Sequence, residues 1–175
     1  MTVASDITKE LRSAISEVNY WFESESESPF RIARSRNANI TPDRIKSLDL
    51  GMRRTMAVGG SYTLPDRDTV VLTQKDLTVF HAEIDSFVAL IAETHQGIAA
   101  GTHSYLQLES ATETLEFNVE VYNLLNALED LTINYVDYPD DPYVGLIIIG
   151  LADSIDRNGA PTKEAIIMRS LLTQT

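Results

Sequence analysis

The sequence contains no cysteine, a single tryptophan and few basic residues. Without cysteine the chain forms no disulfide, no thiolate nucleophile and no cysteine-based zinc site, so its stability must come from burial. No apolar run approaches the ~18 residues that a membrane span needs, and the longest, VGLIIIGLA at 144–152, is about half that length. The first 20 residues lack the basic start and apolar middle of a signal peptide. We therefore expect a cytoplasmic protein with no membrane partner.

The chain has 175 residues, of which 43% are hydrophobic. This length suffices for one domain with its own core and is short for two. We therefore expect a single domain over residues 1–175.

Acidic residues dominate the remaining composition, with a formal net charge of -12. The charge is uneven: residues 55–175 carry 18 acidic and five basic residues, whereas residues 31–54 hold seven of the 14 basic ones. Such a field repels phosphates and attracts cations. The composition therefore argues against direct nucleic-acid binding and favours a basic protein as the partner.

Apolar spacing predicts helices alternating with strands. We expect a first helix from Ser5, as N-cap, to the ESESES stretch, and a second helix over 41–51 that ends at Gly51 and is followed by a loop over 52–68. Further helices are predicted over 77–100 and about 110–131. The predicted strands cover 29–35, 69–74, 132–138, 143–152 and 164–175. This order, which ends in a three-strand meander, predicts an α/β layered domain.

Three motifs suggest other chemistry, and each has a plainer interpretation. The three histidines have no spacing for a shared metal, and the H-x-E at 81–83 lacks the cysteines of a zinc deaminase. The SIDRNG stretch at 154–159 resembles part of a calcium loop, but Asn158-Gly159 favours a hairpin tip. Paired carboxylates such as Asp140 and Asp141 leave a small hydrolase open, provided that two acids share a buried pocket.

The stretch FESESESPF at 22–30 places three glutamates at every second position. In an extended chain alternate side chains share a side, so Glu23, Glu25 and Glu27 point the same way, about 7 Å apart. Alternating serine and glutamate is also common in a solvated loop. Like charges in such a row need either water or a cationic partner.

The order of these segments resembles the nuclease A inhibitor family. The resemblance covers roughly residues 6–36 and 117–175, and its most specific pieces are the Ser-Glu-Ser-Glu-x-Pro-Phe string and the C-terminal threonine on the last strand. Residues 50–105 have no counterpart and are expected to be an insertion. The resemblance implies a three-layer α/β/α sandwich like that of pathogenesis-related protein 1, with a mixed or antiparallel sheet.

The resemblance also implies a function: inhibition of a sugar-non-specific, metal-dependent DNA/RNA endonuclease. It implies that Glu25 pairs with an active-centre arginine and that Thr175 reaches the nuclease's catalytic magnesium, with Glu23, Glu27 and Gln174 beside them. Carboxylate and hydroxyl oxygens are ligands that magnesium accepts. The protein itself is expected to be no enzyme, to need no cofactor, and to act as a monomer or in a 1:1 complex. The alternative is a regulatory module of the same fold that binds another basic protein.

Overall fold

The computed structural model describes residues 2–15, 20–21, 24–25, 30–58, 60 and 62–173. Its described helices are α1 (Val3–Ala14), α2 (Pro42–Ala57), α3 (Val79–Ala99) and α4 (Tyr105–Asn126), with a short 3-10 helix at Arg67–Thr69. The described strands are β1 (Tyr20–Trp21), β2 (Ser24–Glu25), β3 (Arg31–Ser35), β4 (Val71–Lys75), β5 (Glu129–Asp137), β6 (Tyr143–Ile155) and β7 (Pro161–Thr173).

Five of the strands form one antiparallel sheet in the order β3-β7-β6-β5-β4. The last three strands follow one another as a meander, and β1 pairs separately with β2. The predicted α/β class and the closing meander are thus confirmed, and the sheet is antiparallel rather than mixed. Long strand pairing between β6 and β7, from Tyr143 opposite Thr173 to Ile155 opposite Pro161, forms its centre.

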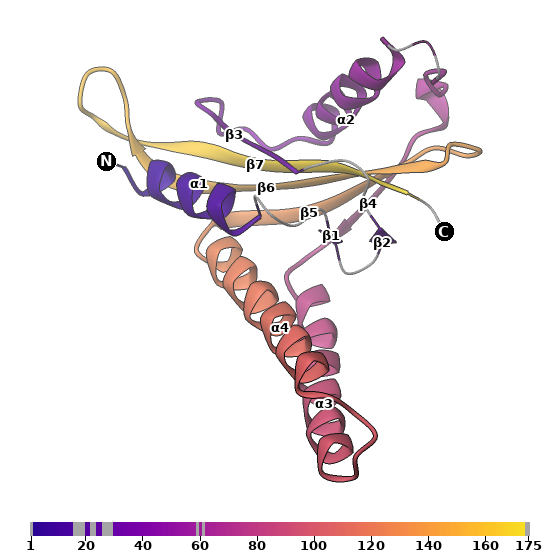
Figure 1. Cartoon of the computed structure of the whole chain (residues 1–175). Helices are drawn as coiled ribbons and strands as arrows, with labels where there is room; N and C mark the ends of the chain where they lie inside the picture. The colour runs from indigo at the N-terminus through magenta and orange to yellow at the C-terminus, as the bar shows by residue number, and fades with distance from the viewer. Residues whose placement is uncertain are drawn as a thin grey trace.

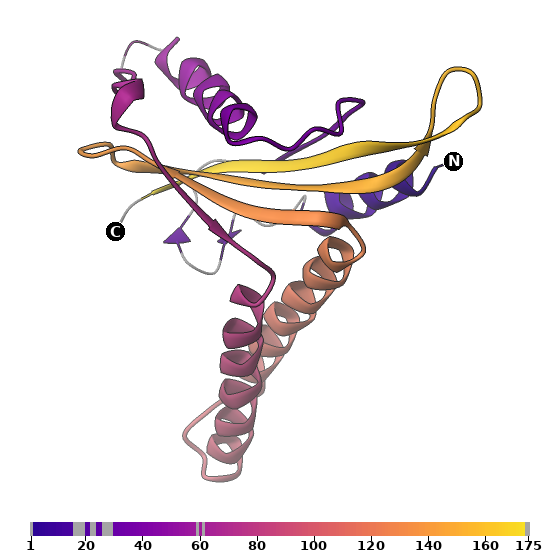
Figure 2. The ribbon, with the colours of Figure 1, turned by 180° about the vertical axis from the view of Figure 1, so that it is seen from behind.

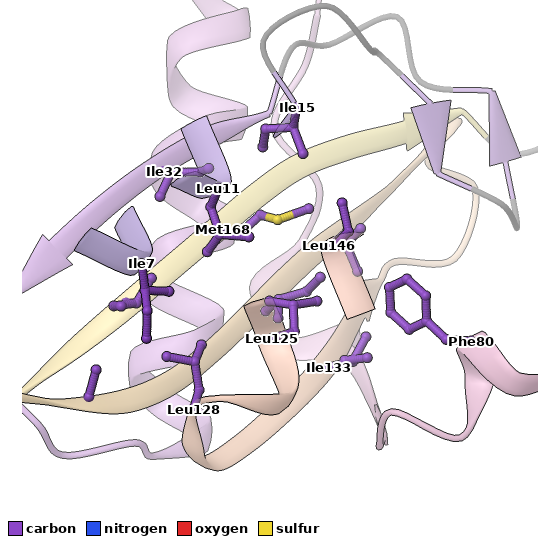
Figure 3. Close-up of a cluster of buried hydrophobic side chains, with 14 of the residues drawn as sticks. Ile7, Leu11, Ile15, Ile32, Phe80, Leu125, Leu128, Ile133, Leu146 and Met168 are labelled. Atoms are coloured by element: carbon purple, nitrogen blue, oxygen red, sulfur yellow. The ribbon is translucent and has the colours of Figure 1, made fainter. Parts of the chain in front are cut away.

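The central strand β6 is buried on both faces of the sheet. Leu146 and Ile148 pack into one apolar cluster, together with Ile7 and Leu11 of α1. Figure 3 shows this cluster, in which Leu125 at the end of α4 and Phe80 at the start of α3 also take part. Because side chains alternate along a strand, the intervening residues face the opposite side.

Helix α2 covers that opposite side. Ile147 and Ile149 of β6 pack there with Ile45 and Met52 of α2. Figure 1 shows α2 on one side of the sheet and α1 with the end of α4 on the other. Burial on both faces explains why β6 reads as a continuous apolar run rather than an alternating one.

Helices α3 and α4 form a long hairpin that projects from the sheet (Figures 1 and 2). Its base belongs to the core, since Phe80, Val121 and Leu125 are buried there. Phe80 and Tyr122 also meet edge to face, with ring centroids 6.0 Å apart. Part of the expected insertion at 50–105 is therefore one arm of this hairpin, and β4 within the same stretch is an edge strand of the sheet.

The prediction that α2 ends at Gly51 is wrong. The helix runs through Gly51 to Ala57, so the predicted loop over 52–68 begins six residues too early. Met52 and Arg53 explain the difference, because both are buried against the sheet and hold the next turn in place. The predicted start of α2 is confirmed, since the Thr41 hydroxyl caps the helix by accepting from the Arg44 N–H at 3.3 Å.

Two other helix starts also differ from the prediction. Helix α1 begins at Val3 because Thr2, rather than Ser5, is its N-cap. Helix α4 begins at Tyr105 because Ser104 and Gln107 form a capping box, and it ends before residues 129–131, which belong to β5. The hairpin tip at Asn158-Gly159 is confirmed: it joins β6 to β7, and Gly159 has a φ of +83°.

The turn of the α3–α4 hairpin depends on Gly97. A Cβ at this position would lie 1.8 Å from His103 Nδ1. The carbonyl of Gly97 accepts from the backbone N–H groups of Thr102 (2.8 Å) and His103 (3.3 Å), so the loop is held close to the helix. Because the backbone of His103 is held there, its imidazole can make room for an added Cβ only by changing its side-chain torsions.

We expect Gly97→Ala to lower the free energy of unfolding by about 1–3 kcal/mol, the usual cost of overpacking. This loss reverses the gain of ~1 kcal/mol that alanine normally brings to a helix interior. Gly51→Ala is the matched control, because no atom lies within 4 Å of its added Cβ, and we expect it to stabilise the protein. Urea unfolding followed by far-UV circular dichroism measures both; equal effects at the two sites would contradict the close approach of His103.

Candidate functional site

The residues predicted to bind a partner lie mostly outside the described part of the chain. This applies to Glu23, Glu27, Gln174 and Thr175. Glu25 is described through its backbone, which lies in β2 opposite Tyr20 of β1. The backbone of Ser24 and Glu25 is thus extended, as the alternating pattern predicted for this pair.

Strand β2 lies against β7 in space, although more than 130 residues separate them in sequence. Strand β7 ends at Thr173, two residues before Thr175. Both views place the β1–β2 pair near the end of the sheet at which β7 finishes (Figures 1 and 2). The fold therefore brings Glu25 of β2 close to the strand that leads to Thr175.

The turn between β5 and β6 lies at the same end of the sheet, because Tyr143 pairs with Thr173. This turn carries the acidic stretch at 137–141, in which Asp140 is exposed and has a left-handed φ of +66°. The sequence identified Asp140 and Asp141 only as one of several carboxylate pairs. The structure places the exposed Asp140 at the end of the sheet where β7 finishes.

A buried arginine fixes this turn to helix α2. Arg53 Nε donates to Asp49 Oδ2 at 2.8 Å, and its Nη2 donates to the carbonyls of Tyr143 (2.9 Å) and Val136 (3.2 Å). Its Nη1 lies 2.9 Å from Asp141 Oδ1. All sides of the guanidinium are thus occupied within the protein, and its side chain is 0% exposed.

Tyr62 completes the network from the segment after α2. Its hydroxyl accepts from Arg53 Nη1 at 2.9 Å and donates to Asp141 Oδ2 at 2.5 Å. Asp141 in turn accepts from the backbone N–H of Tyr143 at 2.8 Å. Arg53 also lies 4.5 Å from the centre of the Tyr138 ring, a cation–π contact. We refer to Asp49, Arg53, Tyr62 and Asp141 as the Arg53 network.

Glycine at position 145 allows the network to approach the sheet. A Cβ on Gly145 would lie 1.9 Å from Asp49 Oδ1, so any larger residue would displace the carboxylate. Sequence reasoning missed this arrangement. The available signal was the spacing of Asp49 and Arg53, which places both charges on the same face of α2 as the apolar Ile45.

Burial shifts the protonation of the network. Burial raises the pKa of Asp49, and the charge and hydrogen bond of Arg53 offset only part of this shift. Burial opposes the charged form of Arg53, yet attraction to Asp49 leaves the pKa of the guanidinium above its ordinary value. Burial and the hydrogen bond to Asp141 raise the pKa of Tyr62 to about 12.

The Arg53 network holds structure together and offers no reacting group to a substrate. Asp49 and Asp141 are two buried acids of the kind a small carboxylate hydrolase would need, but Arg53 lies between them and pairs with both. Neither acid lines the best-formed pockets on the described surface. These two acids therefore give no support to the hydrolase hypothesis.

Among the described residues, histidine, aspartate and glutamate side chains do not gather in any group of three or more that could hold a metal ion. Among the same residues, no helix has both the length and the apolar character needed to cross a membrane.

Comparison of the chain with protein-family models, with curated protein sequences and with solved structures finds no match.

We expect Arg53→Leu to lower the free energy of unfolding by about 3–5 kcal/mol, because it leaves Asp49 and Asp141 buried without their common partner. Arg54→Leu is the matched control: Arg54 is the next residue of α2 and is exposed, so its loss should change stability by ~0.5 kcal/mol or less. Chemical denaturation of both variants tests this. A small effect of Arg53→Leu would show that the network contributes little to stability.

The raised pKa of Tyr62 predicts a loss of stability in alkali. An unfolded tyrosine ionises near pH ~10, whereas Tyr62 in the fold ionises at about 12. The stability that this pKa difference contributes is therefore complete below pH ~10, and it is lost as the pH rises through about 12. Urea midpoints across this range should fall less in Tyr62→Phe than in the parent protein. Tyr105→Phe, at an exposed position, should leave the pH dependence unchanged.

Proposed function

We propose that the protein inhibits a sugar-non-specific, metal-dependent DNA/RNA endonuclease, with the acidic end of its sheet inserted into the nuclease active site. The observation that carries the proposal is the position of β2 against β7. Glu25 lies in the first of these strands, and Thr175 lies two residues beyond the second. A single enzyme cleft can receive two groups only when they lie at the same end of the inhibitor.

The two groups have different tasks in this proposal. Glu25 forms charge-assisted hydrogen bonds with an arginine of the nuclease, in place of a substrate phosphate. Thr175 supplies oxygen to the catalytic magnesium of the nuclease, and Gln174 lies beside it at the rim. Glu23 and Glu27 remain near solvent and mainly speed the approach, because they add to a long-range negative field.

The architecture supports this proposal. An antiparallel sheet with α1 on one face and α2 on the other is compatible with the three-layer α/β/α sandwich of pathogenesis-related protein 1 that the resemblance implies. The Arg53 network gives the acidic end a rigid support, because it ties the β5–β6 turn to α2. Rigid placement reduces the entropy that is lost on binding.

The inhibitor acts in the cytoplasm, carries out no catalysis itself, and forms a 1:1 complex that buries about 1,600 Å². A net charge of -12 speeds its association with a basic nuclease at low salt. The second candidate is an interaction module for another basic protein. The specific observation in its favour is the α3–α4 hairpin, which projects away from the proposed inhibitory end (Figure 1).

We expect Glu25→Ala and deletion of Thr175 each to raise the inhibition constant at least ~30-fold, which corresponds to the ~2 kcal/mol lower limit for losing a desolvated interface charge. Glu23→Ala is the matched control and should change it by less than about fivefold. The measurement is nucleic-acid digestion by a panel of magnesium-dependent, sugar-non-specific nucleases.

Equal inhibition by all three variants would contradict the assigned roles of Glu25 and Thr175. If micromolar parent protein slows no member of the panel, the inhibitor function is wrong and the interaction module replaces it.

A further inference from the structure

The outer half of the α3–α4 hairpin carries apolar side chains that the core does not cover. Val88 and Leu90 of α3 are 52% and 43% exposed, and Tyr105 and Leu106 of α4 are 76% and 73% exposed. The inner half, which includes Phe80 at the start of α3 and Leu125 at the end of α4, packs against the sheet and α1 instead. The outer half of the hairpin therefore leaves apolar surface exposed to solvent.

A groove of about 510 Å³ runs between the two helices in this outer half. Its apolar walls come from Phe87 and Leu90 of α3 and from Leu106 and Ala111 of α4. Five polar residues complete the lining: Thr94, His103, Gln107, Ser110 and Thr114. The lining spans about eight residues on each helix, so the groove is long enough for about two to three turns of a third helix.

Acidic residues border the groove on both sides. At 100° per residue, Glu109 and Glu113 fall on the face of α4 next to Leu106, and Glu93 falls next to Leu90 on α3. All three carboxylates are exposed. None of them has an ion-pair partner within the described part of the chain.

The hairpin contains no positive counterpart to these acids, since residues 76–156 include no lysine and no arginine. Helices α3 and α4 together carry seven acidic residues: Glu83, Asp85, Glu93, Glu109, Glu113, Glu116 and Glu120. A second copy of this hairpin would therefore bring negative charge against negative charge. Charge complementarity selects a cationic occupant instead.

We propose that this groove binds a cationic amphipathic helix of a partner protein. The apolar stripe of that helix packs on Leu90 and Leu106, and its lysine or arginine side chains pair with the glutamates on the two rims. This combination is the general arrangement of helix-in-groove recognition. The inference does not rest on the proposed nuclease inhibition, because it uses neither β2 nor the residues after β7.

The test uses a fluorescent 18-residue peptide of leucine and lysine, with leucine at helical i, i+3, i+4 spacing. Fluorescence anisotropy should show saturable 1:1 binding to the full chain, which weakens as salt rises. A peptide with glutamate in place of lysine should not bind. A peptide of the same composition with strictly alternating leucine and lysine should bind at least ~10-fold more weakly, because its apolar face has strand spacing.

Two pairs of variants locate the binding site. Leu90→Gln with Leu106→Gln, and separately Glu109→Gln with Glu113→Gln, should each weaken peptide binding at least ~10-fold. Val58→Gln is the control for an exposed apolar residue, at 87% exposure, and Glu10→Gln with Asp43→Asn is the control for lost charge. Far-UV circular dichroism shows whether each variant is folded. If the leucine variant does not fold, the glutamate variant alone tests the proposal.

Three results would overturn the proposal. The first is no peptide binding at about 100-fold molar excess of protein. The second is equal weakening by the groove variants and their controls, which would mean a general charge effect. The third is a dimer in sedimentation that the leucine variant dissociates, which would make the groove a contact between two copies. Nuclease inhibition by the groove variants should equal that of the parent protein, so failure here is separate from failure of the inhibitor function.

Discussion

The contact of Arg53 with Asp49 and Asp141 determines how helix α2 is joined to the sheet. Helix α2 reaches the sheet with an apolar stripe, and a charged pair lies within that stripe. A buried guanidinium is tolerated only when its donors find acceptors, and here two carboxylates, one hydroxyl and two backbone carbonyls meet that need. Replacement of any one member removes a partner from at least one other buried member, so the residues of the set depend on one another.

This unit also determines the position of the sheet end. Asp141 and Tyr143 belong to the β5–β6 turn and the start of β6, and Tyr143 pairs with Thr173 at the end of β7. A chain of contacts therefore runs from α2 through the turn to the last residues of the described chain. Gly145 belongs to the same arrangement, because only a residue without a side chain lets Asp49 approach β6. The β5–β6 turn and the end of β7 are thus tied to α2.

Much of the architecture could be predicted from local pattern, because burial repeats along each element. The strands of the meander follow from apolar runs bounded by turn residues, and Thr41 with Pro42 marks the start of α2. The missed end of α2 depends on distant contacts, whereas the missed starts of α1 and α4 depend on local caps at Thr2 and Ser104. Gly51 resembles a helix end until Met52 and Arg53 are seen to be buried by the sheet. The local sequence of a helix does not indicate which strand lies beneath its next turn.

The candidate site also has parts that the sequence predicts and parts that it does not. The row of glutamates at 23, 25 and 27 could be identified from alternation alone, whereas its neighbourhood could not, because β2 and β7 lie far apart in sequence. The Arg53 network left a trace, two opposite charges on an apolar helix face, but their partners Tyr62 and Asp141 come from separate segments. Contacts between segments that lie far apart in the sequence are known only from the structure.

The distribution of acid over the fold suggests two separate surfaces rather than one continuous field. Helix α3 has 21 residues and so extends about 32 Å, while charges in physiological salt are screened over ~8 Å. The tip of the hairpin thus lies several screening lengths from its base at the sheet, so charges at the two places interact weakly. Their chemistry differs as well: the sheet end carries the exposed Asp140, whereas the hairpin carries carboxylates around a groove with apolar walls. The proposed nuclease contact uses the first surface and the proposed helical contact uses the second, so the two proposals do not compete for the same residues.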